Sequence, residues 1–175
     1  MIEDPTRLAL TWAMGGSGKI LNKYRPEEIP EDYKNYVAMC EKGIDILDWY
    51  HYFEVGEFFY HPALGINVVE RGQNVGCFYC HDPERDIIDF KIKAKDSTWL
   101  PSEEHLKSLA SDINLNQQGL DNFLDDDNGY FDYPKGVKPR SIFTTPEQHW
   151  LGYYMYTWHH RIWSKEKRDW VWVKR

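Results

Sequence analysis

The residues whose types and spacing are most suited to chemistry are those from Cys77 to His81, with the sequence Cys-Phe-Tyr-Cys-His. Two thiolates three positions apart can coordinate one Zn²⁺ ion when the chain forms a tight knuckle. His81 would be a third ligand, and a fourth ligand would come from elsewhere in the chain. The aromatic residues between the thiols instead favour a strand, in which residues three apart point to opposite faces. We therefore expect no cofactor and keep zinc or another divalent metal, held by Cys77, Cys80 and His81, as the alternative.

The adjacent pair His81-Asp82 supports a second hypothesis, in which the chain is an enzyme. His51 precedes the pair and Asp132 follows it, and this order resembles the metal ligands of HD-type phosphohydrolases. The resemblance implies a metal-bound water that attacks a phosphate ester. The catalytic residues would then be His51, His81, Asp82 and Asp132. The family carries these ligands on helices, whereas the pair here ends an expected strand just before Pro83, so a metal-dependent phosphohydrolase is the alternative function.

Aromatic residues are the strongest anomaly of composition, at 16% of the chain with eight Trp and twelve Tyr. Many of them fall after Thr145-Pro146-Glu147-Gln148, a capping box that predicts a helix from there to about residue 162. One stripe of this helix contains Trp150, Tyr154, Trp158 and Ile162. A second face contains His149, Tyr153, Tyr156 and His160. Because the same aromatic residues also suit a strand, the choice between helix and strand over 149–162 stays open.

We expect the tryptophan stripe to face the core and the second face to lie near the surface. Tyrosine and tryptophan are enriched at the centres of protein interfaces, although a small domain can also use them to fill its core. The sequence therefore favours a non-catalytic interaction or assembly domain that binds another protein or a second copy of itself. The interaction residues would be Tyr153, Tyr156, His149 and His160. A subunit of a larger viral or phage-like particle would fit.

The elements that must position these residues follow from periodicity and turn signals. Apolar residues at steps of three and four predict a helix over 31–50, and further helices are expected over 5–14, 102–113 and 117–124. Strands are expected over 66–70, 74–80 and 87–94 as an antiparallel meander with a tight turn at 71–73, and over 170–173 as a closing strand. Asn128-Gly129 indicates a hairpin. The predicted fold is α+β, a small antiparallel sheet flanked by three or four helices in one domain over residues 1–175.

Charge and hydropathy restrict the kinds of partner that the chain is expected to bind. The formal net charge of −7 disfavours nucleic acid unless basic residues cluster, and in sequence they cluster only over 165–175. No apolar stretch approaches the ~20 residues of a membrane span, so we expect no membrane partner. The acidic N-terminus is unlike a signal peptide and the three cysteines suit a reducing compartment, which together predict a cytoplasmic protein.

Overall fold

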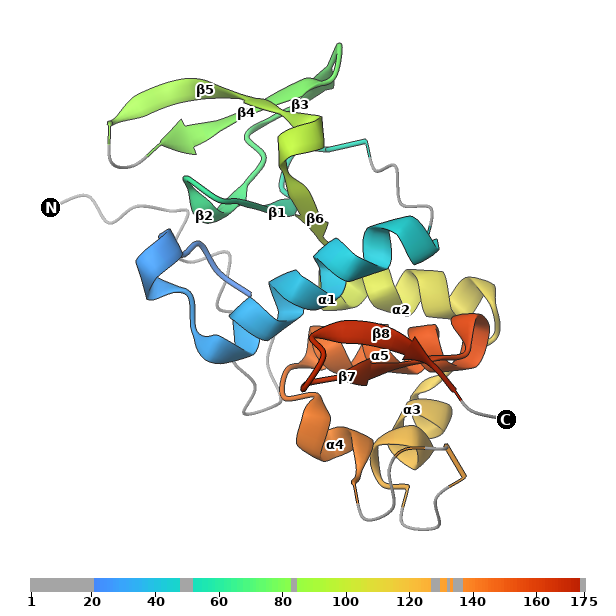
Figure 1. Cartoon of the computed structure of the whole chain (residues 1–175). Coiled ribbons are helices and arrows are strands. Elements are labelled where there is room, and N and C mark those ends of the chain that lie inside the picture. The colour runs from blue at the N-terminus through green and yellow to red at the C-terminus, as the bar shows by residue number, and fades with distance from the viewer. Residues whose placement is uncertain are drawn as a thin grey trace, which may run out of the picture.

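The computed structural model describes residues 21–47, 52–82, 85–126, 130–131, 133 and 137–173. Within these ranges, five α-helices accompany small antiparallel sheets of two or three strands, which confirms the predicted α+β fold. The sheets formed by β1 to β6 lie at one end of the molecule and most helices at the other (Figure 1). The helices are η2 Pro26–Glu28, α1 Glu31–Leu47, η3 Ala94–Asp96, α2 Glu103–Asp112, α3 Gln117–Leu124, α4 Pro139–Ile142 and α5 Pro146–His159. The strands are β1 Phe58–His61, β2 Gly65–Val68, β3 Arg71–Asn74, β4 Cys77–Asp82, β5 Ile87–Lys93, β6 Thr98–Leu100, β7 Arg161–Ser164 and β8 Asp169–Trp172.

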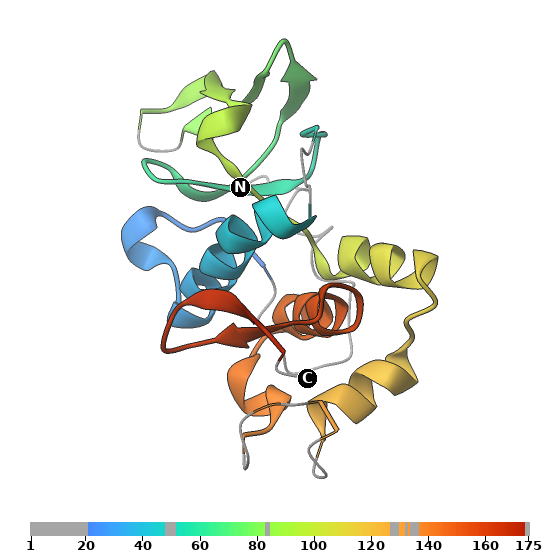
Figure 2. The same cartoon turned by 45° about the vertical axis from the view of Figure 1, so that its right-hand side comes forward.

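The helical end is built around α5. This helix packs against α1, α2, α3 and β7, and Figure 2 shows it nearly end-on between the C-terminal hairpin and α2. The predicted apolar stripe of α1 is confirmed, because Tyr33, Tyr36 and Cys40 are fully buried. The predicted caps are confirmed too: Ser102 Oγ accepts from the His105 amide, and Thr145 Oγ1 accepts from the Gln148 amide.

Two three-stranded sheets make up the other end, in the orders β2-β1-β6 and β3-β4-β5. Their inner faces share a small aromatic cluster in which the Phe78 ring lies 4.4 Å from Phe53 and 4.7 Å from Phe59, centroid to centroid. The other buried members of this cluster are Val69, Cys80, Ile92 and Trp99. The second sheet therefore has one buried face and one that is directed away from the rest of the described chain (Figure 1).

The predicted meander forms with a different first strand. Residues 71–73, expected as a turn, belong to β3, and the strand expected over 66–70 is β2 of the other sheet. The turn lies instead at Val75 and Gly76, which have φ angles of 49° and 72°. Two successive residues with positive φ are the requirement of the tight hairpin turn whose twist matches that of the strands. The sequence did not predict this turn because its first residue is a valine, where Asn, Asp or Gly is usual.

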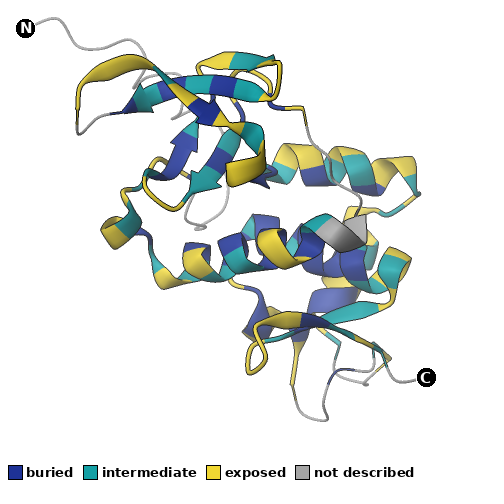
Figure 3. Cartoon of the chain, turned by 45° about the horizontal axis from the view of Figure 1, so that its top comes forward, coloured by how far each residue is buried: buried dark blue, intermediate teal, exposed yellow. Residues whose placement is uncertain are grey.

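The C-terminal helix ends three residues earlier than expected. His160 adopts a left-handed conformation with φ of 52°, and the chain then turns back as the hairpin of β7 and β8. The closing strand predicted over 170–173 is confirmed as β8. Trp163 and Trp170 pair across the hairpin and pack their rings together at 5.2 Å. Both are buried against the helices, as the dark regions of Figure 3 illustrate for the helical core as a whole.

Two expectations lie outside the described residues: the helix over 5–14 and the Asn128-Gly129 turn. The end of the helix predicted over 31–50 is also outside, because α1 is described only to residue 47. Within the described ranges, no helix has the length and apolar character needed to cross a bilayer. The prediction that all 175 residues form one domain stays a prediction.

Candidate functional site

The two cysteines of the C-x-x-C-H string lie on β4 and point to opposite faces. Cys80 is fully buried among the aromatic residues between the sheets, whereas Cys77 is only partly buried and pairs with Lys93 of β5. Burial raises the pKa of the Cys80 thiol to about 11, which opposes the thiolate form that binds a metal. Among the described residues, no group of three or more His, Cys, Asp or Glu side chains is arranged to hold a metal ion.

The His81-Asp82 pair is divided in the same way. Asp82 is buried, accepts a hydrogen bond from the Arg85 amide at 3.3 Å and lies 3.7 Å from Arg85 Nε. His81 is on the other face of β4, with Nε2 3.4 Å from Asp86 Oδ1. A strand cannot direct adjacent side chains at one ion, so these two residues do not form the metal pair that the phosphohydrolase resemblance requires. His51 and Asp132, the other two members, lie outside the described residues.

The predicted orientation of α5 is wrong. Tyr153 is only 8% exposed and Tyr156 is half-buried, and both rings pack on Phe123 of α3, at 5.5 and 5.8 Å. His149 is also partly buried, where its Nε2 donates to the Phe143 carbonyl at 3.1 Å. Trp158, expected in the core, is 56% exposed.

The physical reason is that α5 is covered on several sides rather than one. Residues on every side of its first three turns are buried, among them Gln148, Trp150, Leu151, Gly152 and Met155. A helix that is apolar all round indicates a central helix, and this signal was available in the sequence. In the last turn Thr157 and Trp158 are exposed, so exposure is concentrated at the end of the helix rather than along one face.

We call the exposed end of α5 and the adjoining hairpin end the C-terminal junction, and it comprises Trp158, His160, Arg161 and Trp172. His160 is exposed and its carbonyl accepts from the Val173 amide at 2.9 Å, which joins the start of β7 to the end of β8. The Arg161 guanidinium lies 3.6 Å from the centroid of the Trp172 ring, a cation–π contact. Arg161 also donates from Nη1 to the Trp170 carbonyl at 3.4 Å. The junction thus presents an arginine-stacked tryptophan at the end of the hairpin, and a second exposed tryptophan, Trp158, in the last turn of α5.

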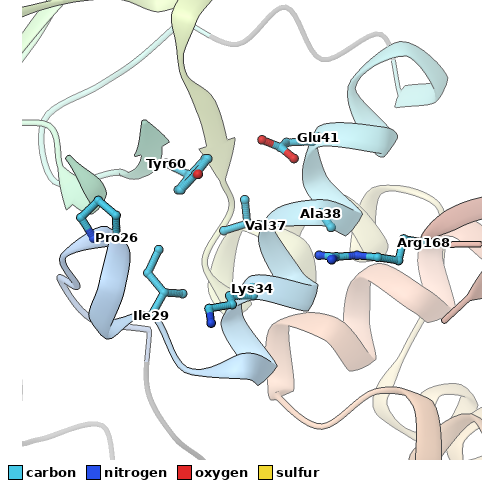
Figure 4. A pocket seen from close by; sticks show the side chains of 8 residues that line it. All are labelled: Pro26, Ile29, Lys34, Val37, Ala38, Glu41, Tyr60 and Arg168. Carbon is cyan, nitrogen blue, oxygen red and sulfur yellow. The ribbon is translucent and has the colours of Figure 1, made fainter. Parts of the chain in front are cut away.

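A small pocket lies on the other side of the helical end, between η2, α1, β1 and the β7–β8 turn (Figure 4). Its volume is about 220 Å³, enough for a small ligand only. Apolar side chains such as Val37 form its wall, and Lys34, Glu41 and Arg168 supply charge. Burial raises the pKa of Glu41, against the lowering effect of Lys42 and Arg168. The mixed charge suits a small molecule that carries both an acidic and a basic group.

Comparison with protein-family models, with curated proteins and with solved structures finds no match to this chain. Of the four interaction residues expected from the sequence, His160 alone belongs to an exposed site, and Trp158, Arg161 and Trp172 join it there.

Proposed function

We propose that the chain is a non-catalytic assembly domain that binds a protein surface through the C-terminal junction. The observation that supports this proposal is the exposure of Trp158 and Trp172, at 56% and 64%. The four other tryptophans in the described ranges are at most 7% exposed. Of the six tryptophans that the structure describes, the fold thus buries four and leaves Trp158 and Trp172 exposed, near the point where α5 passes into the hairpin.

The residue types suit the centre of an interface. Tryptophan and arginine are the residues most enriched among those that dominate binding energy, and here Arg161 already holds the Trp172 ring in place. Covering the exposed parts of both tryptophans would remove roughly 250 Å² from water, worth about 6 kcal/mol before the costs of association. A stable interface buries about 800 Å² per partner, so the junction would be its centre and neighbouring polar residues its rim.

The partner to test first is a second copy of the chain. Sedimentation velocity across a wide range of protein concentration should show reversible association of the wild type. The double variant Trp158→Ser/Trp172→Ser should weaken association at least tenfold, because each serine removes most of an apolar anchor. Thermal melting should show the variant folded, since both side chains are largely exposed.

Ile88→Ser is the matched control, because Ile88 is a 75% exposed apolar residue on β5, at the other end of the molecule. It should leave association unchanged. If the wild type is monomeric throughout, a partner protein must be isolated and its affinity measured against both variants. The proposal fails if no complex, with itself or another protein, depends on the two tryptophans.

A further inference from the structure

The outer face of the β3-β4-β5 sheet gathers basic and aromatic side chains that are scattered in the sequence. We call it the basic sheet face, and it comprises Arg71, Tyr79, Lys91 and Lys93. On β4 the residues alternate, with Phe78 and Cys80 buried and Tyr79 between them on the outside. Tyr79 is paired with Arg71 of β3 on one side and with Lys91 of β5 on the other. Lys93 follows two positions along β5, on the same face as Lys91.

The charge on this face is not balanced within the described part of the chain. Arg71 has one acidic neighbour, Asp89, with Nη1 3.7 Å from Oδ2. Lys91 and Lys93 are exposed and have no ion-pair partner among the described residues. Because Asp89 offsets only Arg71, Lys91 and Lys93 leave the face with an excess of positive charge on a chain of net charge −7. At the far end of β4, His81 lies 3.4 Å from Asp86, so this pair adds no positive charge from lysine or arginine to the face.

The same face carries a cation–π pair that helps to line a hollow. The Arg71 guanidinium lies over the Tyr79 ring, 3.7 Å from its centroid, a cation–π contact that covers one side of the ring. We call this pair the Arg71–Tyr79 platform, because the outer side of the guanidinium offers a plane on which a base can stack. A hollow of about 580 Å³ surrounds this platform. Its lining residues are Arg71, Gly72, Asn74, Val75, Tyr79 and Lys91. Val75, at the tip of the β3–β4 turn, is 94% exposed and provides an apolar edge.

We propose that the basic sheet face binds single-stranded nucleic acid. Lys91 and Lys93 would neutralise phosphates, and a base would stack on the Arg71–Tyr79 platform. Unpaired bases are read in this way on sheet surfaces because every base offers a flat face and the backbone a regular negative charge. An acidic peptide would use the lysines but would leave the platform empty, so the aromatic component favours nucleic acid. This site is separate from the C-terminal junction and does not depend on the assembly proposal.

The test is fluorescence anisotropy with labelled single-stranded oligouridylate and oligothymidylate of twelve nucleotides, beside a duplex of the same length. We expect both single strands to bind more tightly than the duplex. About three phosphate contacts predict a slope near −2 for the logarithm of the binding constant against that of the salt concentration. Lys91→Ala/Lys93→Ala should reduce the slope to about −0.7. Tyr79→Leu should weaken binding about 5- to 100-fold with the slope unchanged, because it removes stacking and no charge.

Lys165→Ala/Lys167→Ala is the matched control, since it removes the same charge from the exposed β7–β8 turn. It should leave affinity and slope unchanged, with thermal melting used to show that every variant is folded. Equal weakening by the control and the Lys91/Lys93 variant would reduce the effect to net charge and overturn the proposal. No binding of either strand at low salt overturns it as well. If polyglutamate at matched charge fully displaces the labelled oligonucleotide, and Tyr79→Leu does not change the affinity, the face binds an acidic protein instead.

Discussion

Single residues decide the chemistry of the C-x-x-C-H string. Because β4 turns Cys80 inward and Cys77 outward, the two thiols differ in surroundings although they are three positions apart. Cys80→Ser should cost about 1–3 kcal/mol of unfolding free energy, since it places a hydroxyl among aromatic rings. Cys77→Ser should cost less than about 0.5 kcal/mol. Urea unfolding measures both, and equal large losses that added zinc restores would show that the metal hypothesis is the better one.

At the scale of the element, the first turn of α5 contains a buried acid. Glu147 is 5% exposed, and its Oε2 is buried with no hydrogen-bond partner among the residues that the structure describes. Burial raises the pKa of this carboxyl, although hydrogen bonds at the start of the helix lower it in part. Because the pKa of this carboxyl is higher in the folded than in the unfolded state, its contribution to the unfolding free energy is fully present below the unfolded pKa of about 4.3. That contribution is lost as pH rises through the folded pKa.

Glu147→Gln should remove this decline, because glutamine does not ionise. The unfolding free energy of the variant minus that of the wild type should therefore be more positive at pH 7 than at pH 4. Burial lowers the pKa of His149, so the unfolding free energy also falls as pH falls below about 6.5. His149 is present in both proteins, so its contribution cancels in the difference between variant and wild type. Chemical unfolding at the two pH values measures the effect, and an equal difference at both would contradict it.

At the scale of the whole molecule, the C-terminal hairpin is attached to α1, more than 120 residues earlier in the chain. Trp163 Nε1 donates to Asn35 Oδ1 at 3.0 Å, and Trp170 Nε1 donates to the Met39 carbonyl at 2.9 Å. Trp170→Ala should cost about 3–5 kcal/mol of unfolding free energy, as the loss of a buried aromatic side chain does. Trp172→Ala, two positions along the same strand but exposed, should cost less than about 1 kcal/mol. Thermal and urea unfolding of the pair test this, and similar losses would mean that the hairpin is not anchored through Trp170.

The sequence by itself determined the features that depend on neighbours along the chain. The caps at Ser102 and Thr145 fixed two helix starts, because a side-chain oxygen three residues before an amide can satisfy it locally. The stripe of Tyr33, Tyr36 and Cys40 fixed the buried face of α1. Alternation in β4 was enough to separate Cys77 from Cys80.

Only the tertiary structure decided which surfaces remained in water. Tyr153 is buried because α3 packs against that part of α5, whereas Trp158 in the last turn stays exposed, and both follow from packing rather than from the helical period. Arg71 and Lys91 lie eight to twelve residues from Tyr79 in the chain and meet beside it only through strand pairing. Local signals report short-range hydrogen bonds and periodicity, whereas burial and strand register depend on contacts between distant segments, which the sequence pattern does not specify.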